Sequence, residues 1–379
     1  MPQNQRADIN QFQPTPTGFY SYHTPDDALI PYRLHLRVLP DNTGILIVNA
    51  ASILRLNETG TYFAWLKMQG KTKDEISVEF LQRYQVDETS LKSDIQRFDQ
   101  QILTIVSDPD QAPLITATGF NTVGADEQNA IPLRVNFCLT DRWGDDFVSS
   151  YKELSTEEWK TLIRKTFETG IPQVIFIGGE PTLRADLAEL IQYTEELGMV
   201  SGLLTASARI YQDHSYLNSL LDGGLDHLII EFDLEGGQDP KQLQLVFDQD
   251  LFTCIRFPVR RQSEIYTWVN DLVQAGANAI SFYAADLNSH DRVAHLTQQL
   301  TTEDLVIEQD LPYPINPDST EHRSELYSPE VTDHYPVYYT VFPDGTVANQ
   351  NRTDHLLGNL LDSNWTDLIN ISKTQKEPL

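Results

Sequence analysis

The stretch Gly170-Ile-Pro-Gln-Val-Ile-Phe-Ile-Gly-Gly-Glu-Pro-Thr-Leu-Arg184 decides the fold of the larger part of the chain. Its apolar run Val174–Ile177 is short and uninterrupted, as expected for a strand buried on both faces. Gly178-Gly179-Glu180-Pro181 follows directly. The two glycines would let a ligand approach the backbone closely, and the carboxylate could accept a hydrogen bond from an amine. A tight turn between a strand and a helix is the competing interpretation.

From Leu133 onward, strand-like and helix-like patterns alternate. The apolar strand candidates are Leu133–Leu139, Val174–Ile177, Gly202–Thr205, His227–Phe232, Phe252–Phe257 and Ala279–Tyr283. The helical patterns between them are Thr156–Phe167, Asp186–Leu197, Tyr216–Leu221 and Glu264–Ala275. This alternation predicts a parallel sheet covered by helices. Ligands in such folds bind at the carboxyl ends of the strands, which predicts chemistry in the loops after Leu139, Ile177, Thr205 and Phe232.

The composition excludes several classes of protein. The 379 residues contain 27 Lys and Arg against 55 Asp and Glu, a net charge of 27 − 55 = −28. Such a chain is not expected to bind nucleic acid or anionic lipid, since both need a basic surface. The N-terminus lacks the apolar core of a signal peptide, and no run of about 18 apolar residues occurs. We therefore expect a soluble cytoplasmic protein.

Changes in composition divide the chain into five expected segments. They are a flexible tail over 1–25, a small domain over 26–110, a linker over 111–131, the alternating strand–helix unit over 132–302 and a C-terminal extension over 303–379. In the extension, Tyr338–Val347 predicts a hairpin that turns at Asp344-Gly345, and Asn364–Ile369 predicts a short final helix.

The small domain is expected to be winged-helix-like, of the α+β class. Alternation over Tyr32–Val38 and the apolar run Ile45–Val48 predict a hairpin, with turn residues at Asp41–Gly44. Three amphipathic helices should follow. Their expected N-terminal caps are Asn57, Thr72 and Asp87.

Residues from about 132 to 300 closely resemble the radical S-adenosylmethionine superfamily. The segments that carry the resemblance follow the order and spacing of its first four strand–helix units: Leu139–Arg142, Leu154–Trp159, Gly170–Arg184, Leu197–Val200 and Leu220–His227. The resemblance implies a partial (β/α)6 barrel of the TIM type. It also implies that the S-adenosylmethionine-binding loop of the family corresponds to Gly178, Gly179, Glu180 and Pro181.

The cluster-binding cysteines of that family are replaced in this chain. Where the family has Cys-x-x-x-Cys-x-x-Cys-Tyr, the sequence has Trp143-Gly-Asp-Asp-Phe147-Val-Ser-Ser150-Tyr151. In the family, the three thiolates hold a [4Fe–4S] cluster whose fourth iron binds S-adenosylmethionine. Tryptophan and phenylalanine cannot ligate iron, and serine is a poor substitute for a thiolate. We therefore expect no cluster and no radical chemistry, with Trp143 and Phe147 filling the space by apolar groups.

The two cysteines of the chain do not replace the missing ligands. Cys138 lies five residues before Trp143 on a predicted strand, and Cys254 is expected to be a small buried apolar residue. Thr205-Ala206-Ser207 stands where relatives usually have Thr-Asn-Gly, so an amide is lost beside the expected cofactor ribose. No cofactor is therefore expected.

Residues from about 30 to 105 look like a PqqD-type peptide-recognition domain, mainly through Leu56-Asn-Glu-Thr-Gly-Thr-Tyr62 and the two helices after it. Such domains capture a leader peptide by adding it as a strand to their hairpin. The resemblance implies that the peptide-binding edge of the hairpin comprises Leu34, Leu36, Val38, Ile45 and Ile47.

The C-terminal Val341–Val347, followed by Leu357–Leu360, resembles the SPASM extension of peptide-modifying radical enzymes. In that extension, the strand after Pro-Asp-Gly leads to cysteines that hold auxiliary clusters. Here the corresponding residues are Ala348-Asn349-Gln350-Asn351, and no cysteine follows Cys254. Auxiliary clusters are therefore expected to be absent as well.

Other groups leave alternatives open. No HExxH or paired histidine spacing occurs, so no zinc site is expected, and His227 is expected to be structural. One group of acidic residues could bind a divalent cation, or it could simply be solvated. Its members are Asp141, Asp145, Asp146 and Glu180. Three arginines could bind a carboxylate or phosphate group of a ligand, or they could pair with neighbouring acidic side chains. They are Arg256, Arg260 and Arg261.

The sequence thus predicts a non-catalytic pseudoenzyme that binds a peptide or protein partner. A precursor peptide and an active radical enzyme are the expected partners. The alternative is an enzyme that binds S-adenosylmethionine or another nucleotide through Gly178, Gly179 and Glu180 and uses Asp145, Asp146 and Ser150 for polar chemistry. In a third interpretation, the N-terminal domain is a scaffold without a peptide role.

Overall fold

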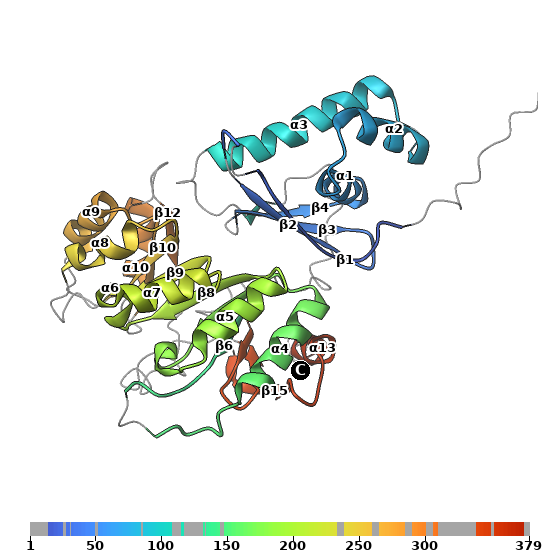
Figure 1. Cartoon of the computed structure of the whole chain (residues 1–379). Helices are drawn as coiled ribbons and strands as arrows, with labels where there is room; N and C mark the ends of the chain where they lie inside the picture. The colour runs from blue at the N-terminus through green and yellow to red at the C-terminus, as the bar shows by residue number, and fades with distance from the viewer. Residues whose placement is uncertain are drawn as a thin grey trace, which may run out of the picture. The chain divides into compact units, whose positions relative to one another are not determined.

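A computed structural model describes residues 14–25, 28–30, 32–49, 52–84, 86–107, 115–116, 132, 134–144, 148–232, 239–259, 265–284, 290–300, 306–309, 339–349 and 352–374. The chain divides into two compact units (Figure 1), Met1–Pro109 with Pro113–Ala125, and Asp110–Ala112 with Asp126–Leu379. Most of the expected linker 111–131 and of residues 303–338 of the expected extension lies outside the described residues. Over the residues that are described, no helix combines the length and the apolar character needed to cross a membrane.

The N-terminal unit is built on a five-stranded sheet in the order β1-β2-β3-β4-β5. Its strands are β1 (Gly18–His23), β2 (Arg33–Val38), β3 (Gly44–Val48), β4 (Ser52–Leu56) and β5 (Ile115–Thr116). The first four are antiparallel to their neighbours, and β5 pairs with β4 in parallel. The predicted hairpin is present as β2 and β3. Its turn depends on Asp41, whose Oδ1 accepts from the Thr43 amide at 2.9 Å, and on Asn42 at φ +66°.

The prediction of a loose tail over residues 1–25 is wrong for Gly18–His23. These residues form β1 and pair with β2 over its full length, from Gly18 opposite Val38 to His23 opposite Arg33. The side chains of Tyr20 and Tyr22 pack against the core of the unit, and that apolar contact holds the strand. Residues 1–13 of the predicted tail lie outside the described residues.

Three helices lie on one side of this sheet (Figure 1): α1 (Glu58–Met68), α2 (Lys73–Arg83) and α3 (Glu88–Ser107). Each begins after a predicted cap. Asn57 Oδ1 accepts from the Gly60 amide at 2.9 Å, Thr72 and Glu75 form a reciprocal capping box, and Asp87 Oδ2 accepts from the Ser90 amide at 2.9 Å. The helices bury alternate strand residues, among them Leu34, Leu36 and Val38.

The C-terminal unit contains a sheet that is ten strands wide over the described residues, in the order β12-β11-β10-β9-β8-β7-β6-β13-β14-β15. The parallel strands are β6 (Arg134–Cys138), β7 (Gln173–Ile177), β8 (Val200–Thr205), β9 (His227–Glu231), β10 (Phe252–Val259), β11 (Ala279–Ala284) and β12 (Val306–Gln309). Strands β6 to β12 lie side by side in chain order. The six predicted strands are β6 to β11, and they are parallel as the alternation predicted. All their carboxyl ends therefore lie at one edge of the sheet.

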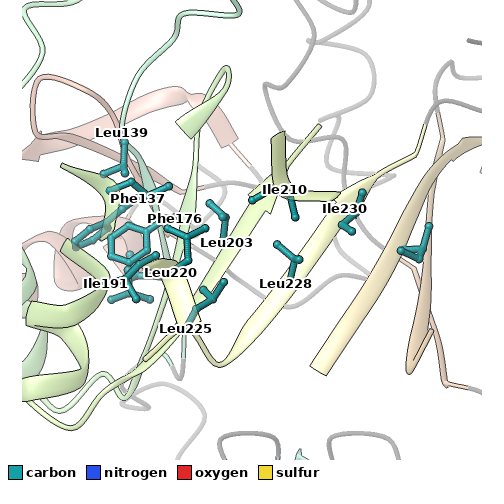
Figure 2. Close-up of a cluster of buried hydrophobic side chains, with 14 of the residues drawn as sticks. Phe137, Leu139, Phe176, Ile191, Leu203, Ile210, Leu220, Leu225, Leu228 and Ile230 are labelled. Carbon is teal, nitrogen blue, oxygen red and sulfur yellow. The ribbon is translucent and has the colours of Figure 1, made fainter. Parts of the chain in front are cut away.

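Helices connect successive strands of this sheet. They are α4 (Thr156–Thr169), α5 (Leu187–Glu196), α6 (Arg209–Gln212), α7 (His214–Asp222), α8 (Gln244–Phe247), α9 (Ile265–Ala275) and α10 (His290–Leu300). Figure 2 shows the core between strands and helices, where Phe176 and Leu203 of the sheet meet Ile191 of α5 and Leu220 of α7. Alternate strand residues point to the opposite face, where a second apolar cluster contains Cys138, Ile175, Ile177 and Leu204.

The predicted C-terminal extension is not a separate unit, because its strands continue the main sheet. They are β13 (Tyr339–Val341), β14 (Thr346–Asn349) and β15 (Arg352–Asn359), followed by α13 (Trp365–Thr374). Strand β13 pairs in parallel with β6, and β13 and β14 form the predicted hairpin, with Gly345 at φ +86° in its turn. The buried indole of Trp365 donates from Nε1 to Thr166 Oγ1 of α4 at 2.8 Å, which fixes α13 on the larger unit.

Candidate functional site

The two glycines after β7 are required by a neighbouring loop of the chain. The Gly179 amide donates to Thr140 O at 2.7 Å, and the Glu180 amide donates to Arg142 O at 2.6 Å, so the loops after β6 and β7 stay paired beyond the strands. A Cβ on Gly178 would lie 2.4 Å from Thr140 O, and one on Gly179 would lie 2.1 Å from Arg142 O. Backbone packing against Thr140–Arg142 therefore accounts for both glycines without a ligand.

The carboxylate of Glu180 is buried and bound by the chain itself. Oε1 accepts from the Thr182 amide at 2.9 Å, from Thr182 Oγ1 at 2.6 Å and from Thr205 Oγ1 at 2.8 Å. Oε2 accepts from the Ala206 amide at 3.0 Å. Glu180 thus joins the loops after β7 and β8, and Pro181 follows it as the first residue of a 3-10 turn, Pro181–Leu183. The role of these residues in binding S-adenosylmethionine stays a prediction.

Behind these loops, Arg184 fixes the segment that leads into α4. It forms a two-point ion pair with Asp186, from Nε to Oδ1 at 2.9 Å and from Nη2 to Oδ2 at 2.7 Å. Nη1 and Nη2 also donate to Leu154 O, each at 3.2 Å. Burial raises the pKa of Asp186, but the hydrogen bonds from Arg184 and Thr156 outweigh it, and the pKa is lowered overall. The carboxylate is therefore ionised wherever the unit is folded at neutral pH.

The loop that would carry the cluster ligands is packed with other groups. Trp143 contacts the apolar cluster on the face of the sheet away from the helices, whose members include Cys138, Ile177 and Leu204. Ser150 is exposed, and its amide donates to Asp141 Oδ2 at 2.8 Å. Phe147, Asp145 and Asp146 lie outside the described residues. The space beside the carboxyl ends of β6 to β8 thus contains an indole.

A family-type iron–sulfur cluster does not fit these residues. It needs three thiolates, and the sequence has Trp143, Phe147 and Ser150 at those positions. Cys138 and Cys254 are both buried, and Cys138 Sγ contacts Thr140 O at 3.6 Å. Within the described part of the chain, no group of three or more His, Cys, Asp or Glu side chains is arranged to hold a metal ion.

Tyr216 lies beside the loops after β7 and β8. The guanidinium of Arg209 stacks on its ring at 3.6 Å, and its phenol oxygen is buried with no hydrogen-bond partner among the described residues. Burial raises the pKa of Tyr216 to about 12; Arg209 lowers it, whereas the charges of Glu180 and Asp213 raise it. The phenol is therefore protonated at neutral pH.

A second polar cluster lies on the face of the sheet away from the helices. Arg256 of β10 is fully buried and donates from Nη1 to Glu231 Oε2 of β9 at 2.9 Å, while its guanidinium stacks on the ring of Tyr283 at 4.0 Å. Tyr283 of β11 donates its hydroxyl to Glu231. Ser281, opposite Arg256 in register, has a buried hydroxyl without a partner among the described residues. Arg260 and Arg261 lie outside them.

Sequence reasoning considered Arg256 but missed Glu231, Tyr283 and Tyr216. Glu231 ends the strand His227–Glu231, and a charged residue at the carboxyl end of a buried strand is a signal that could have identified it. His227, predicted to be structural, lies at the start of the same strand, where its Nδ1 is 3.2 Å from Gln173 Nε2.

The predicted peptide-binding edge of the N-terminal unit is not an open edge. Leu34, Leu36 and Val38 lie on β2, which has β1 on one side and β3 on the other. Ile45 and Ile47 lie on β3, between β2 and β4. Gly18–His23 occupy the position beside β2 that was assigned to a peptide, so a peptide could pair with β2 only in their place. All five side chains are buried.

Comparisons with known proteins place this geometry in context. Residues 44–104 match the family model "Coenzyme PQQ synthesis protein D (PqqD)". The chain is 41% identical over 105 residues to a PqqA peptide cyclase of Bradyrhizobium diazoefficiens, which is 27% of this chain and 25% of that protein. It is 41% identical over 80 residues to a PqqA peptide cyclase of Rhodopseudomonas palustris, or 21% of each chain. The chain thus matches about a quarter or less of the length of these relatives.

The fold as a whole is similar to that of SuiB from Streptococcus suis, in its structure bound to the precursor peptide SuiA. The two chains superimpose with a TM-score of 0.51 at 14% identity, over 88% of this chain and 86% of SuiB. The similarity shows that the chain has a mixed α/β fold of the SuiB kind.

Proposed function

We propose that this chain is a cluster-free relative of peptide-modifying radical S-adenosylmethionine enzymes that binds a peptide without catalysing a reaction. In this proposal, strands β6 to β11 and their helices form a partial (β/α)6 barrel, and the N-terminal unit is a winged-helix-like peptide-binding domain. Its expected context is the maturation of a ribosomally made peptide or protein, as an accessory to an active enzyme.

The main support is the packing of Trp143 against the apolar cluster of Cys138, Ile175, Ile177 and Leu204. A bulky apolar side chain stands at the first cluster-ligand position and contributes to a packed cluster there. The hydrogen bonds of Glu180 to Thr182, Thr205 and Ala206 add to this support, since they are made within the chain. Both features favour the interpretation that the chain's own side chains fill the expected cluster and cofactor positions and have a structural role there.

Peptide binding is supported by the PqqD match and by the similarity to SuiB. In the described residues, β4 pairs on its outer side only at Ile53 and Leu54, with the two residues of β5. Free backbone groups on an outer strand can pair with an extended peptide. We propose the outer side of β4 as the place where a partner peptide adds as a strand.

Anaerobic reconstitution with iron and sulfide tests the cluster-free assignment. The wild-type chain should retain less than one iron, whereas a variant with Trp143→Cys, Phe147→Cys and Ser150→Cys restores the ligand spacing and should gain iron and visible absorbance. About four irons in the wild-type chain would overturn the proposal. Calorimetric titration with S-adenosylmethionine in the absence of iron tests the alternative enzyme, since micromolar binding would favour it over the pseudoenzyme.

Hydrogen exchange tests the peptide role. Short peptides encoded beside the gene are added to the full chain, and the amides of Ser52–Leu56 should become protected by the peptide that binds. Protection confined to the larger unit would contradict the proposed site. No protection by any of these peptides, with no co-purifying peptide detected by mass spectrometry, would leave the N-terminal unit as a scaffold.

A further inference from the structure

The segment before β1 closes a pocket on the helices of the N-terminal unit. A cavity of about 370 Å³ lies between residues 14–16 and helices α1 and α2, and its walls include Tyr62, Trp65, Glu79 and Arg83. The cavity lies on the helices and does not include residues of β4, where the partner peptide was placed above.

One side chain of this segment, that of Thr15, is buried next to the pocket on the helices. Thr15 is 1% exposed, whereas Pro14, Pro16 and Thr17 on either side are exposed. The hydroxyl of Thr15 is buried and has no hydrogen-bond partner among the described residues. Prolines on both sides restrict the backbone to an extended conformation, which presents the threonine to the pocket at a low entropic cost.

The wall that receives Thr15 is aromatic and carries one free donor. The rings of Tyr62 and Trp65 are stacked at 5.9 Å, and the guanidinium of Arg83 lies 4.0 Å from the centre of the Tyr62 ring. Trp65 Nε1 is buried and has no partner in the described part of the chain. An aromatic wall with an indole donor is the arrangement that grips proline-rich extended segments, whose carbonyl groups are free to accept.

Strand β1 continues this contact along the sheet. Tyr20 donates its hydroxyl to Pro16 O at 2.9 Å, and its ring meets Trp65 edge-on at 6.4 Å. From Gly18 to His23 the segment pairs with β2. Residues 14–23 are therefore held as a recognised peptide is held, by a pocket for one side chain and by strand pairing for the backbone.

We propose that the α1/α2 pocket and the β2 edge form a second peptide-binding site, which residues 14–23 occupy as a displaceable ligand in cis. The site takes an extended segment with a small β-branched residue between two prolines, followed by a strand. The Thr15 hydroxyl and the Trp65 Nε1 are buried and have no hydrogen-bond partner among the described residues, and the free-energy cost of such groups weakens the cis complex. A partner segment that places an acceptor in the remaining cavity replaces it.

This inference does not depend on the proposed function, since β2 and β4 are different strands of the sheet. A peptide at β4 protects Ser52–Leu56, whereas a ligand at the second site replaces β1 on Arg33–Val38. Failure of one proposal therefore leaves the other standing.

A matched pair of variants in the full chain tests the cis contact. Thr15→Gly removes the inserted side chain, and Thr17→Gly makes the same change at an exposed position of the same segment. Hydrogen exchange of the Phe19–His23 amides should be at least ten times faster in Thr15→Gly than in Thr17→Gly. Equal exchange in the two variants would overturn the proposal.

A labelled peptide of residues 14–24, followed by fluorescence anisotropy, tests the site in trans. The cis segment competes at an effective concentration on the order of millimolar. The peptide should therefore bind Thr15→Gly at least tenfold more tightly than the wild-type chain, and the same peptide with Thr15→Gly should bind neither. If the protein variant does not fold, millimolar peptide added to the wild-type chain should still speed the exchange of its own Phe19–His23 amides. Equal affinity for folded wild-type and variant chains, or unchanged exchange in the wild-type chain, would refute the site.

Discussion

Arg256 and Glu231 lie opposite each other on the parallel strands β10 and β9 and form an ion pair of 2.9 Å between Nη1 and Oε2. The guanidinium is fully buried, and its stacking on Tyr283 places that ring over the pair. The sheet therefore carries a buried ion pair on the face that also bears the Trp143 cluster.

Glu231→Gln should destabilise the chain by about 3 kcal/mol, because it removes the negative charge that pairs with the buried guanidinium of Arg256. Tyr283→Phe is the matched comparison, since it removes the hydroxyl hydrogen bond to Glu231 but leaves the ion pair, and it should cost about 1 kcal/mol. Urea unfolding of the three chains measures both values. Equal losses in the two variants would mean that the charge contributes nothing beyond one hydrogen bond.

Gly179→Ala should destabilise the chain by about 3 kcal/mol, because its Cβ would lie 2.1 Å from Arg142 O and the two loops would have to separate. Gly144→Ala is the control in the same loop region, since a Cβ there meets no atom within 4 Å. Thermal unfolding should place the control within about 0.5 kcal/mol of the wild-type chain. A harmless Gly179→Ala would contradict the explanation of this glycine by loop packing.

Tyr216 should make stability fall in alkaline solution. Its pKa is raised by burial from 10.0 to about 12, so the folded state keeps a proton that the unfolded chain releases. The stabilisation is complete below pH 10 and is lost as the pH rises from 10 toward 12. Tyr216→Phe should lack this component of the decline, and at pH 7 it should match or slightly exceed the wild-type stability, since the hydroxyl has no partner among the described residues. Urea unfolding between pH 7 and pH 11 measures the difference; parallel curves would contradict the assignment.

Asp186 should act at the acid end of the pH range. Its folded pKa lies below the ordinary value of 3.8, because hydrogen bonds from Arg184 and Thr156 outweigh the opposing effect of burial. The stabilisation is present above the unfolded pKa and is lost as the pH falls through the lower folded value. Asp186→Asn should cost about 2 kcal/mol at pH 7. Its deficit against the wild-type chain should shrink below pH 4, and a deficit that stays constant down to pH 2.5 would contradict this account.

Local patterns predicted many of the helices and strands. Asn57, Thr72 and Asp87 open helices in the sequence and in the structure, because a capping side chain and the amides it binds lie within three residues of one another. The six predicted parallel strands from Leu133 to Tyr283 are also present. They too could be predicted locally, because an uninterrupted apolar run marks a strand that is buried on both faces.

Contacts between distant residues could not be predicted in the same way. Strand β1 was missed because Gly18–His23 follow a polar segment with two prolines and carry only a short alternation, Tyr20-Ser21-Tyr22. The packing of Tyr20 and Tyr22 against the core reveals the strand. The donors that bind Glu180 come from Thr205 and Ala206, which lie on another loop. The fit of Gly179 against Arg142 is likewise a property of the folded chain.

The pairing of β13 with β6 sets a limit on how the gene can be shortened. A fragment that stops before Tyr339 would expose the backbone of Val135–Phe137 along one margin of the sheet. It would also leave Thr166 on α4 without the indole of Trp365. Such a fragment would present a bare strand beside an uncovered apolar surface, a combination that promotes self-association. Expression trials should therefore keep residues 339–374. Within this segment β13 covers the edge of β6 and α13 covers α4, so aggregation through these surfaces is prevented.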